Sequence, residues 1–156
     1  MSPTFRIMAA VDLSEFSTTI VRYSVWLSMR LNADLVLVNV INQRDLDMIQ
    51  RTMTGYAEFS FMNYLTDQVQ DRKSKLKELF EAASPGMVNC RYIVQPGIPY
   101  RELLAVIESE KANLMVVGTK GRSNLADVVV GSTARKMYRR SPIPLLTIPA
   151  AFNELP

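Results

Sequence analysis

The chain has 156 residues, of which 48% are hydrophobic and 21% charged, and its formal net charge is +3. A chain of this size and composition is expected to form one domain around a continuous core. It contains no histidine, which excludes Ser-His-Asp and Cys-His catalysis and leaves no imidazole to bind a metal.

The N-terminal residues lack the features of a signal peptide. Arg6 interrupts the first apolar stretch, and neither a long apolar run nor a small-residue cleavage site follows it. No apolar run approaches the roughly 20 residues that span a bilayer. The single cysteine, Cys90, excludes an internal disulfide and is interpreted as a small core residue. We therefore expect a cytoplasmic protein that does not associate with membranes.

The first part of the chain alternates predicted strands and helices. Phe5–Val11 predicts a buried strand that ends at Asp12. A helix is predicted next, with Ser14 and Ser17 as possible N-caps and with apolar residues at spacings of three or four: Phe16, Ile20, Tyr23, Leu27 and Leu31. Leu35–Val40 is apolar almost throughout, which favours a strand in a sheet that is covered on both faces.

Residues 42–62 have no clear periodicity and mix charges with methionine and aromatic residues. A long connection of this kind can be a lid, a partner surface or an irregular packing excursion, and the spacing does not choose among them. A helix is predicted from about Asn63 to Ala83, where the sequence Ser84-Pro85-Gly86 ends it.

The second part of the chain continues the alternation. The predicted elements are a strand at Val88–Val94, a rigid turn at Gln95–Pro99, a short helix with Leu103, Leu104 and Ile107 inside, a strand at Leu114–Val117, a helix at Ser132–Arg140 and a strand at Pro144–Ile148. This order predicts an α/β fold with a mostly parallel sheet, helices on both faces and right-handed crossovers.

A glycine-rich loop separates the last two predicted strands. Two residues separate Gly118 from Gly121, and nine more residues precede the pair Gly131-Ser132. Glycine permits positive φ and close approach of a ligand, and Ser132 and Thr133 begin the next helix, so backbone amides could surround a phosphate there. Turn glycines followed by a serine N-cap would produce the same spacing, so spacing alone leaves a structural loop open. The loop matches neither a Walker A motif nor GxGxxG.

Positive charge is concentrated in the same region. Residues 118–156 carry six basic and two acidic side chains. Lys120 and Arg122 could add charge from the loop, whereas the four basic residues of the following helix can simply complement its dipole. Six basic residues with few aromatics among them are a weak footprint for nucleic acid, which we do not expect as a partner.

The ends of the first and fourth predicted strands are expected to be close. Ligands of open parallel sheets bind beyond the carboxyl ends of the strands, so Asp12 and Gly118 would share a crevice if these strands are neighbours. A carboxylate repels phosphate. Asp12 is therefore better suited to accept hydrogen bonds from the ribose or the base of a nucleotide.

The chain resembles the universal stress protein family over essentially its whole length. The resemblance rests on the Gly118-x2-Gly121-x9-Gly131-Ser132 spacing, on the Ala-Val-Asp ending of the first strand, and on the closing sequence PIPLLTIP. It implies a five-stranded parallel sheet of order 3-2-1-4-5 in a single domain with a variable insert at about 42–62. The glycine pattern is similar to that of the ATP-binding branch, whose members are usually homodimers through the last strand, here Pro144 to Ile148.

The resemblance also implies a role for individual residues. The nucleoside would be held by Val11, Asp12 and Val40, with Val40 offering its backbone to adenine, and Val117 and Gly118 would line the adenosine. The phosphates, with Mg²⁺ neutralising them, would be held by Gly121, Arg122, Gly131, Ser132 and Thr133. One departure is Leu13, where many members of the family have glycine.

The resulting hypothesis is a dimeric, ATP-binding protein of stress response or signalling. No side chain stands out as a general base for an attacking water, so we expect no catalytic residue and at most slow ATP hydrolysis. Two alternatives stay open. One is a nucleotide-independent dimeric adaptor that uses residues 42–62 as its partner surface, and the other is an enzyme of the related nucleotide α-hydrolase group, which adenylates its substrate.

Overall fold

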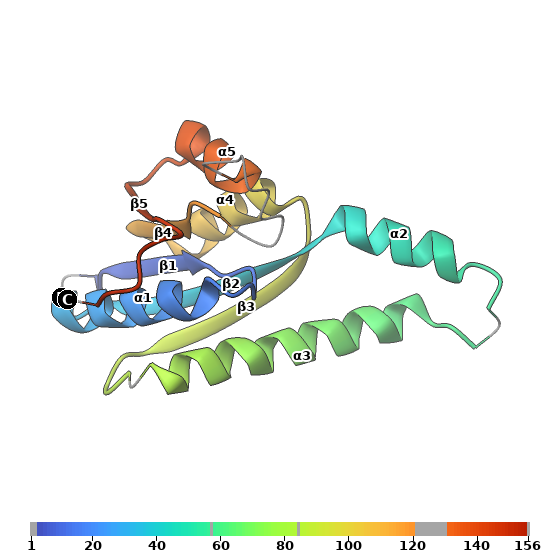
Figure 1. Cartoon of the computed structure of the whole chain (residues 1–156), viewed down its shortest axis with the longest axis horizontal. Helices are drawn as coiled ribbons and strands as arrows, with labels where there is room; N and C mark the ends of the chain where they lie inside the picture. The colour runs from blue at the N-terminus through green and yellow to red at the C-terminus, as the bar shows by residue number, and fades with distance from the viewer. Residues whose placement is uncertain (1–2, 57, 84, 121–130, 156) are drawn as a thin grey trace.

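The computed structural model describes residues 3–155 except 57, 84 and 121–130. Five parallel strands form one sheet in the order β3-β2-β1-β4-β5, which confirms the predicted fold (Figure 1). In chain order, the elements are β1 (Arg6–Ala10), α1 (Ser17–Leu31), β2 (Asp34–Asn42), α2 (Gln43–Met53), α3 (Phe61–Ala82), β3 (Cys90–Gly97), α4 (Pro99–Glu110), β4 (Leu114–Gly118), α5 (Ser132–Arg140) and β5 (Leu145–Ile148).

The sheet separates two hydrophobic clusters. Side chains of α1 and α3 pack against one face together with Ile7 and Ala9 of β1. Side chains of α4 and α5 pack against the other face together with Met8, because successive residues of a strand point to opposite faces. This double coverage is the reason that the central strands are apolar at almost every position, and it leaves the edge at the ends of the strands as the place where polar groups can gather.

The beginning of α1 differs from the prediction. Neither Ser14 nor Ser17 is the N-cap, since the helix begins after Phe16 and no side chain caps it. Ser14 Oγ instead accepts a hydrogen bond from the Phe16 amide at 3.3 Å, and Ser17 Oγ donates to Asp12 Oδ1 at 3.4 Å. Both serines therefore order the turn between β1 and α1.

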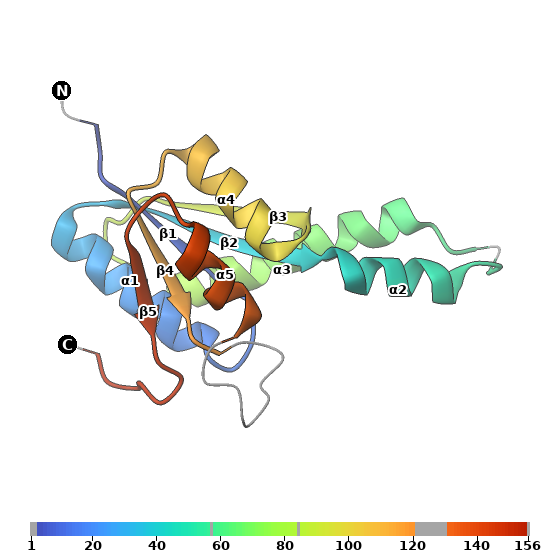
Figure 2. The same cartoon turned by 90° about the horizontal axis from the view of Figure 1, so that it is seen from above.

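Residues 42–62, for which no structure was predicted, contain α2 and the beginning of α3. The side chain of Asn42 caps α2 by accepting from the Arg44 amide at 3.0 Å, and Ser60 caps α3. Leu46 is the buried residue of α2, and Ile49 and Met53 are half-buried on the same face, so the helix carries a short apolar stripe that the sequence analysis did not recognise. Together α2 and the first turns of α3 form an arm that projects beyond the sheet (Figures 1 and 2).

The helix α3 has 22 residues, which is long enough to span a bilayer in length alone. Charged residues are spread along it, and no helix in the described part of the chain is apolar enough over a sufficient length to cross a membrane.

The strand β3 is longer at its carboxyl end than predicted. The expected rigid turn at 95–99 is wrong for its first residues, because β3 continues through Pro96 to Gly97, which lies opposite Asn42 of β2. Proline is tolerated here because β3 is an edge strand. At the other end of this strand, Cys90 packs against the core, and burial raises the pKa of its thiol to about 12, as expected for a core cysteine.

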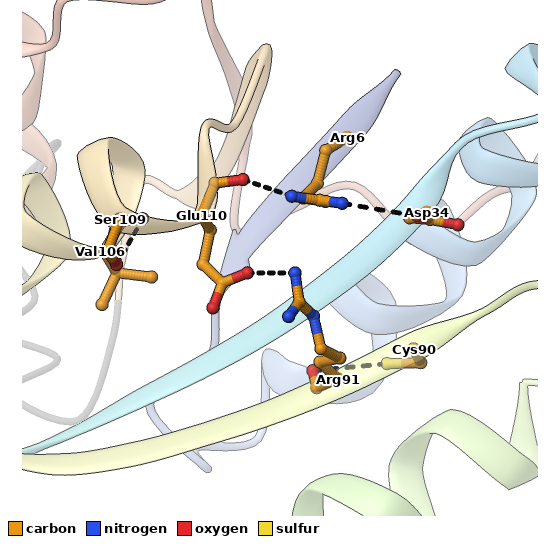
Figure 3. A network of polar contacts seen from close by, with 7 residues as sticks. All are labelled: Arg6, Asp34, Cys90, Arg91, Val106, Ser109 and Glu110. Atoms are coloured by element: carbon orange, nitrogen blue, oxygen red, sulfur yellow. Dashed lines mark hydrogen bonds and ion pairs between the residues drawn. The ribbon is translucent and has the colours of Figure 1, made fainter. Parts of the chain in front are cut away.

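An ionic network joins the amino ends of three strands to the end of α4 (Figure 3). The Arg6 guanidinium donates to the Glu110 carbonyl at 2.5 Å and pairs with Asp34 at 3.7 Å. The Glu110 carboxylate pairs with Arg91 of β3. These residues lie at the amino edge of the sheet, so the network leaves the carboxyl edge free for a ligand.

Candidate functional site

A cleft of about 590 Å³ lies at the carboxyl edge of the sheet. Its floor consists of the ends of β1 and β2, including Val11 and Val40. Its walls include the amino-terminal residues of α2, α4 and α5. Helices that follow parallel strands begin at the same edge of the sheet, so their amino termini converge on the cleft.

Asp12 lies in the cleft immediately after β1. Its Oδ1 accepts hydrogen bonds from the Ser14 amide at 3.0 Å and from Ser17 Oγ at 3.4 Å. Leu13 lies between Asp12 and Ser14 and has a φ of +62°. This is a left-handed conformation that glycine adopts far more easily. The chain has leucine where the family resemblance leads us to expect glycine, but its backbone still adopts the left-handed turn that favours glycine.

Asn39 and Arg72 form a polar pair beside Asp12, and sequence analysis missed both. Asn39 is only 2% exposed. Its Nδ2 donates to the Val11 carbonyl at 2.8 Å, and its Oδ1 accepts from Arg72 of α3 at 3.0 Å. Both side chains line the cleft. The available signal was one asparagine inside the apolar run of β2, because a buried polar side chain requires partners.

The glycines on either side of the undescribed loop residues have different roles. A Cβ on Gly118 would lie 2.8 Å from Ile20 Cδ1, so this glycine allows α1 to approach the end of β4. The Gly131 amide donates to the Thr119 carbonyl at 2.6 Å, which joins the two ends of the loop. Neither glycine has a positive φ. The freedom of φ that we expected is therefore not used at these two positions.

The amino end of α5 faces the cleft through Ser132, Thr133 and Ala134. Gly131 is its N-cap, and no side chain of the described residues caps it. The first backbone N–H groups of a helix lack partners within the helix, and they make this end electropositive. Such a helix end is suited to bind an anion.

Most of the predicted site residues meet in this cleft. Those that line it are Val11, Asp12, Val40, Gly118, Gly131, Ser132 and Thr133. Val117 does not line it, because alternation along β4 directs its side chain into the core beneath α4 and α5. Gly121 and Arg122 lie outside the described residues.

Cations outnumber carboxylates around the cleft. Four basic residues in the described part of the chain line it, namely Arg44, Arg72, Lys120 and Lys136, against Asp12 and Asp45. Among the described residues, no cluster of three potential ligands could hold a metal ion. The cleft therefore combines a carboxylate at the end of β1 with an electropositive helix terminus at α5, and it suits a ligand that has a hydroxyl-bearing part and an anionic part.

Sequence comparison relates residues 4–149 to the universal stress protein family, whose profile they match. The chain is 26% identical to the universal stress protein YxiE of Bacillus subtilis, over 92% of this chain and 97% of that protein. It is 21% identical to the universal stress protein MJ0577 of Methanocaldococcus jannaschii, over 92% and 93% of the two chains.

Comparison of structures finds the same fold. The solved structure of MJ0577 aligns with 96% of this chain and 98% of its own, at a TM-score of 0.75 and 19% identity. A universal stress protein in complex with cAMP aligns over 94% and 98% of the two chains, at a TM-score of 0.64 and 20% identity. A universal stress protein of Archaeoglobus fulgidus in complex with dAMP aligns over 95% and 99%, at a TM-score of 0.59 and 13% identity.

Proposed function

The chain belongs to the universal stress protein family, and from this premise we propose that it is an ATP-binding member that acts in stress response or signalling. The observation that carries the proposal is the cleft itself, in which Asp12 and the amino end of α5 line one cavity. Two structures with the same fold were solved with adenine nucleotides, one with cAMP and one with dAMP. That both ligands are adenine nucleotides supports the choice of nucleotide.

In the proposed complex, the nucleoside lies over the ends of β1 and β2. Asp12 accepts hydrogen bonds from ribose hydroxyls, and the backbone of Val40 bonds to adenine. The phosphates lie at Gly131, Ser132 and Thr133, where the electropositive amino end of α5 stabilises negative charge. Gly121 and Arg122 are proposed as further phosphate ligands, and Mg²⁺ would be held mainly by the phosphates themselves.

Isothermal titration with ATP tests the cleft through a series at Gly131. Among the described residues, a Cβ at this position meets only the Thr119 carbonyl, at 3.5 Å, so Gly131→Ala should fit and bind almost normally. Gly131→Leu extends a side chain into the space proposed for the phosphates and should abolish binding, while its melting temperature stays near that of Gly131→Ala. Equal ATP affinity in the two variants would exclude this end of α5 from the site.

We propose at most slow hydrolysis of the bound ATP. In the described part of the cleft, the carboxylates are those of Asp12 and Asp45, and Asp12 already accepts two hydrogen bonds. A general base must be within reach of the proton that it removes, and Asp12 is proposed to lie at the ribose. Turnover that Asp12→Asn removes while ATP affinity is retained would contradict this assignment.

Homodimerisation through the last strand is a further part of the proposal. β5 is at the edge of the sheet and pairs with β4 alone. The Pro144 and Ile148 carbonyls bond to the β4 side, so by alternation Leu145 and Thr147 present their backbone groups to the outer side. An unpaired edge of this kind can accept the same strand of a second chain.

Light scattering on two variants of Thr147 tests the dimer. Thr147→Pro removes an outward N–H and should produce monomers, whereas Thr147→Val keeps the backbone donor and should stay dimeric. A dimer that persists in Thr147→Pro would mean that the chains associate through another surface.

A nucleotide-independent adaptor is the second candidate, because the arm exposes large apolar side chains. Met48, Tyr56 and Met62 are 58%, 65% and 67% exposed, and exposed apolar groups of this size are common at protein interfaces. If this candidate is correct, ATP at millimolar concentration does not raise the melting temperature. Ligand binding to the native state would otherwise stabilise it.

A further inference from the structure

The helices α4 and α5 lie side by side on one face of the sheet (Figures 1 and 2), and a cluster of cations lies where the first turn of α4 meets α5. Its centre is the ring of Tyr100. Lys136 Nζ is 4.7 Å from the centre of this ring, and Arg140 Cζ is 4.9 Å from it. Arg101 Cζ is 5.7 Å from the same point, and its Nε donates to the Tyr100 hydroxyl at 3.0 Å.

None of the described acidic side chains forms an ion pair with these three cations, Arg101, Lys136 and Arg140. Glu102, the nearest acid along α4, instead accepts a hydrogen bond from Gln95 at 2.6 Å. Cation–π contacts at exposed sites are weak, so the ring gathers the cations without neutralising them. The hydrogen bond from Arg101 is the main cause that lowers the pKa of the Tyr100 phenol, and the charges of the three cations lower it further.

The cluster continues from the rim of the nucleotide cleft. Tyr100 and Lys136 line the cleft, whereas Arg101 and Arg140 lie beyond its lining. On α5, Ser132, Lys136 and Arg140 are four residues apart and share one face of the helix. They form a polar and basic track of about 12 Å that runs outward from the amino end of α5.

We infer that Tyr100, Arg101, Lys136 and Arg140 form a second anion site, which binds a chain of phosphate groups along the contact between α4 and α5. Two cations about one turn apart on α5 and a third at the start of α4 match several linked anionic groups better than one. Guanidinium groups bind phosphate oxygens through directed N–H donors, and Lys136 adds a compact charge. This site does not require that the cleft binds a nucleotide.

Linked phosphates have two sources, namely inorganic polyphosphate and the tail of a nucleotide with more than three phosphates. The probes are therefore inorganic tripolyphosphate, ATP and adenosine tetraphosphate, each titrated calorimetrically into the whole chain. Binding of tripolyphosphate alone assigns the site to the inorganic chain. Adenosine tetraphosphate that binds more tightly than ATP, by a margin that depends on Lys136 and Arg140, assigns it to the nucleotide tail.

A pair of matched double variants tests the residues. K136Q/R140Q removes two cations of the cluster and should weaken tripolyphosphate binding by about tenfold or more, since hydrogen bonds between charged groups are the strong ones. R135Q/R139Q removes the same charge from the same helix, outside the ring contacts, and should change the affinity by less than about twofold, as expected for weak surface charges. Equal losses of tripolyphosphate affinity in the two double variants would mean that only net charge matters, and would overturn the inference.

A spectroscopic titration of the Tyr100 phenol tests the inference without replacing any of the three cations. The titration of Tyr100 is obtained as the difference between the native chain and Tyr100→Phe. Saturating tripolyphosphate should raise the pKa of this phenol, because a bound anion opposes its ionisation. An unchanged titration at saturation would overturn the inference, as would tighter binding of a single-stranded oligonucleotide than of tripolyphosphate.

Titration with adenosine is the control for the cleft. If adenosine does not bind, the proposed nucleotide function is contradicted, but the inference about the second anion site is unaffected.

Discussion

At the scale of single residues, Asn39 joins three parts of the candidate site. It bonds to the carbonyl that ends β1 and to Arg72 of α3, from a buried position in β2. A buried polar group that loses its partner costs about 1–3 kcal/mol. Asn39 therefore stabilises the fold and holds the Arg72 side chain at the cleft.

The variant Asn39→Leu tests this role. It leaves the Val11 carbonyl and the Arg72 guanidinium without this partner, and we expect the free energy of unfolding in urea to fall by about 1–3 kcal/mol. The same change at the exposed Asn89 should cost less than about 0.5 kcal/mol. Similar losses at the two positions would mean that the Asn39 hydrogen bonds contribute little.

Leu13 tests backbone strain at the turn after β1. An L-residue with a Cβ pays roughly 1–2 kcal/mol in the left-handed conformation, and Leu13 has a φ of +62°. Leu13→Gly and Leu13→Ala lose about the same packing, but only glycine relieves the strain. We expect the glycine variant to be more stable than the alanine variant, by about 0.5–1 kcal/mol.

The control for Leu13 is the same pair of substitutions at Leu104, inside α4. There the order should reverse, because glycine destabilises a helix interior relative to alanine by about 1 kcal/mol. Chemical denaturation of the four variants measures both differences. If alanine is preferred at both positions, then the turn does not hold Leu13 in the left-handed conformation.

At the scale of elements, the arm is less firmly attached than the sheet. Leu46 is the buried residue of α2, whereas β2 is buried at most positions. Segments with few buried apolar contacts open locally without global unfolding. The arm is thus a part of the molecule that can move while the floor of the cleft stays in place.

Hydrogen exchange measures this difference. Amides of α2 should exchange well before those of β1 and β2. Asn42→Ala removes the acceptor that caps α2 and should speed exchange in α2 by about fivefold, since such a cap is worth about 1 kcal/mol. Exchange of α2 together with the sheet would instead show that the arm unfolds only with the whole domain.

At the scale of the whole molecule, the candidate binding cleft and the ion pairs that stabilise the fold lie at opposite edges of the sheet. The ionic network of Arg6, Asp34, Arg91 and Glu110 is at the amino edge of the strands (Figure 3), and the cleft is at the carboxyl edge. The central strands between them, β1, β2 and β4, are mostly buried. Changes in the network should therefore alter the stability without altering the geometry of the cleft.

Glu110→Gln provides the corresponding prediction. It removes the ion pair with Arg91, whose side chain is 60% exposed, so the loss should be modest, about 0.5–1 kcal/mol in the free energy of unfolding. The affinity for ATP, measured by calorimetry below the melting temperature, should change by less than about twofold. A large change in affinity would show that the two edges of the sheet are coupled.

Local sequence patterns were sufficient for the strands, for α5 and for the order of elements, because burial on both faces requires continuous apolar runs and helices require periodic ones. They were insufficient for α2, where exposed apolar residues such as Met48 obscure the helical spacing of Leu46, Ile49 and Met53, and for the end of β3, where an edge position tolerates Pro96. The position of Asp12 at the cleft could be predicted because it lies just beyond β1, and that of Ser132 because it begins a helix after a glycine pair of the β4–α5 connection.

The sequence by itself determined the fold class, the family resemblance and seven of the residues that line the cleft. Only the tertiary structure decided that Val117 points into the core, that Asn39 and Arg72 flank Asp12, and that Tyr100 gathers cations from two helices. Each of these depends on residues far apart in the chain, whose proximity is set by the packing of helices on the sheet. Such contacts leave no local pattern, since neither residue of a pair carries information about the position of the other.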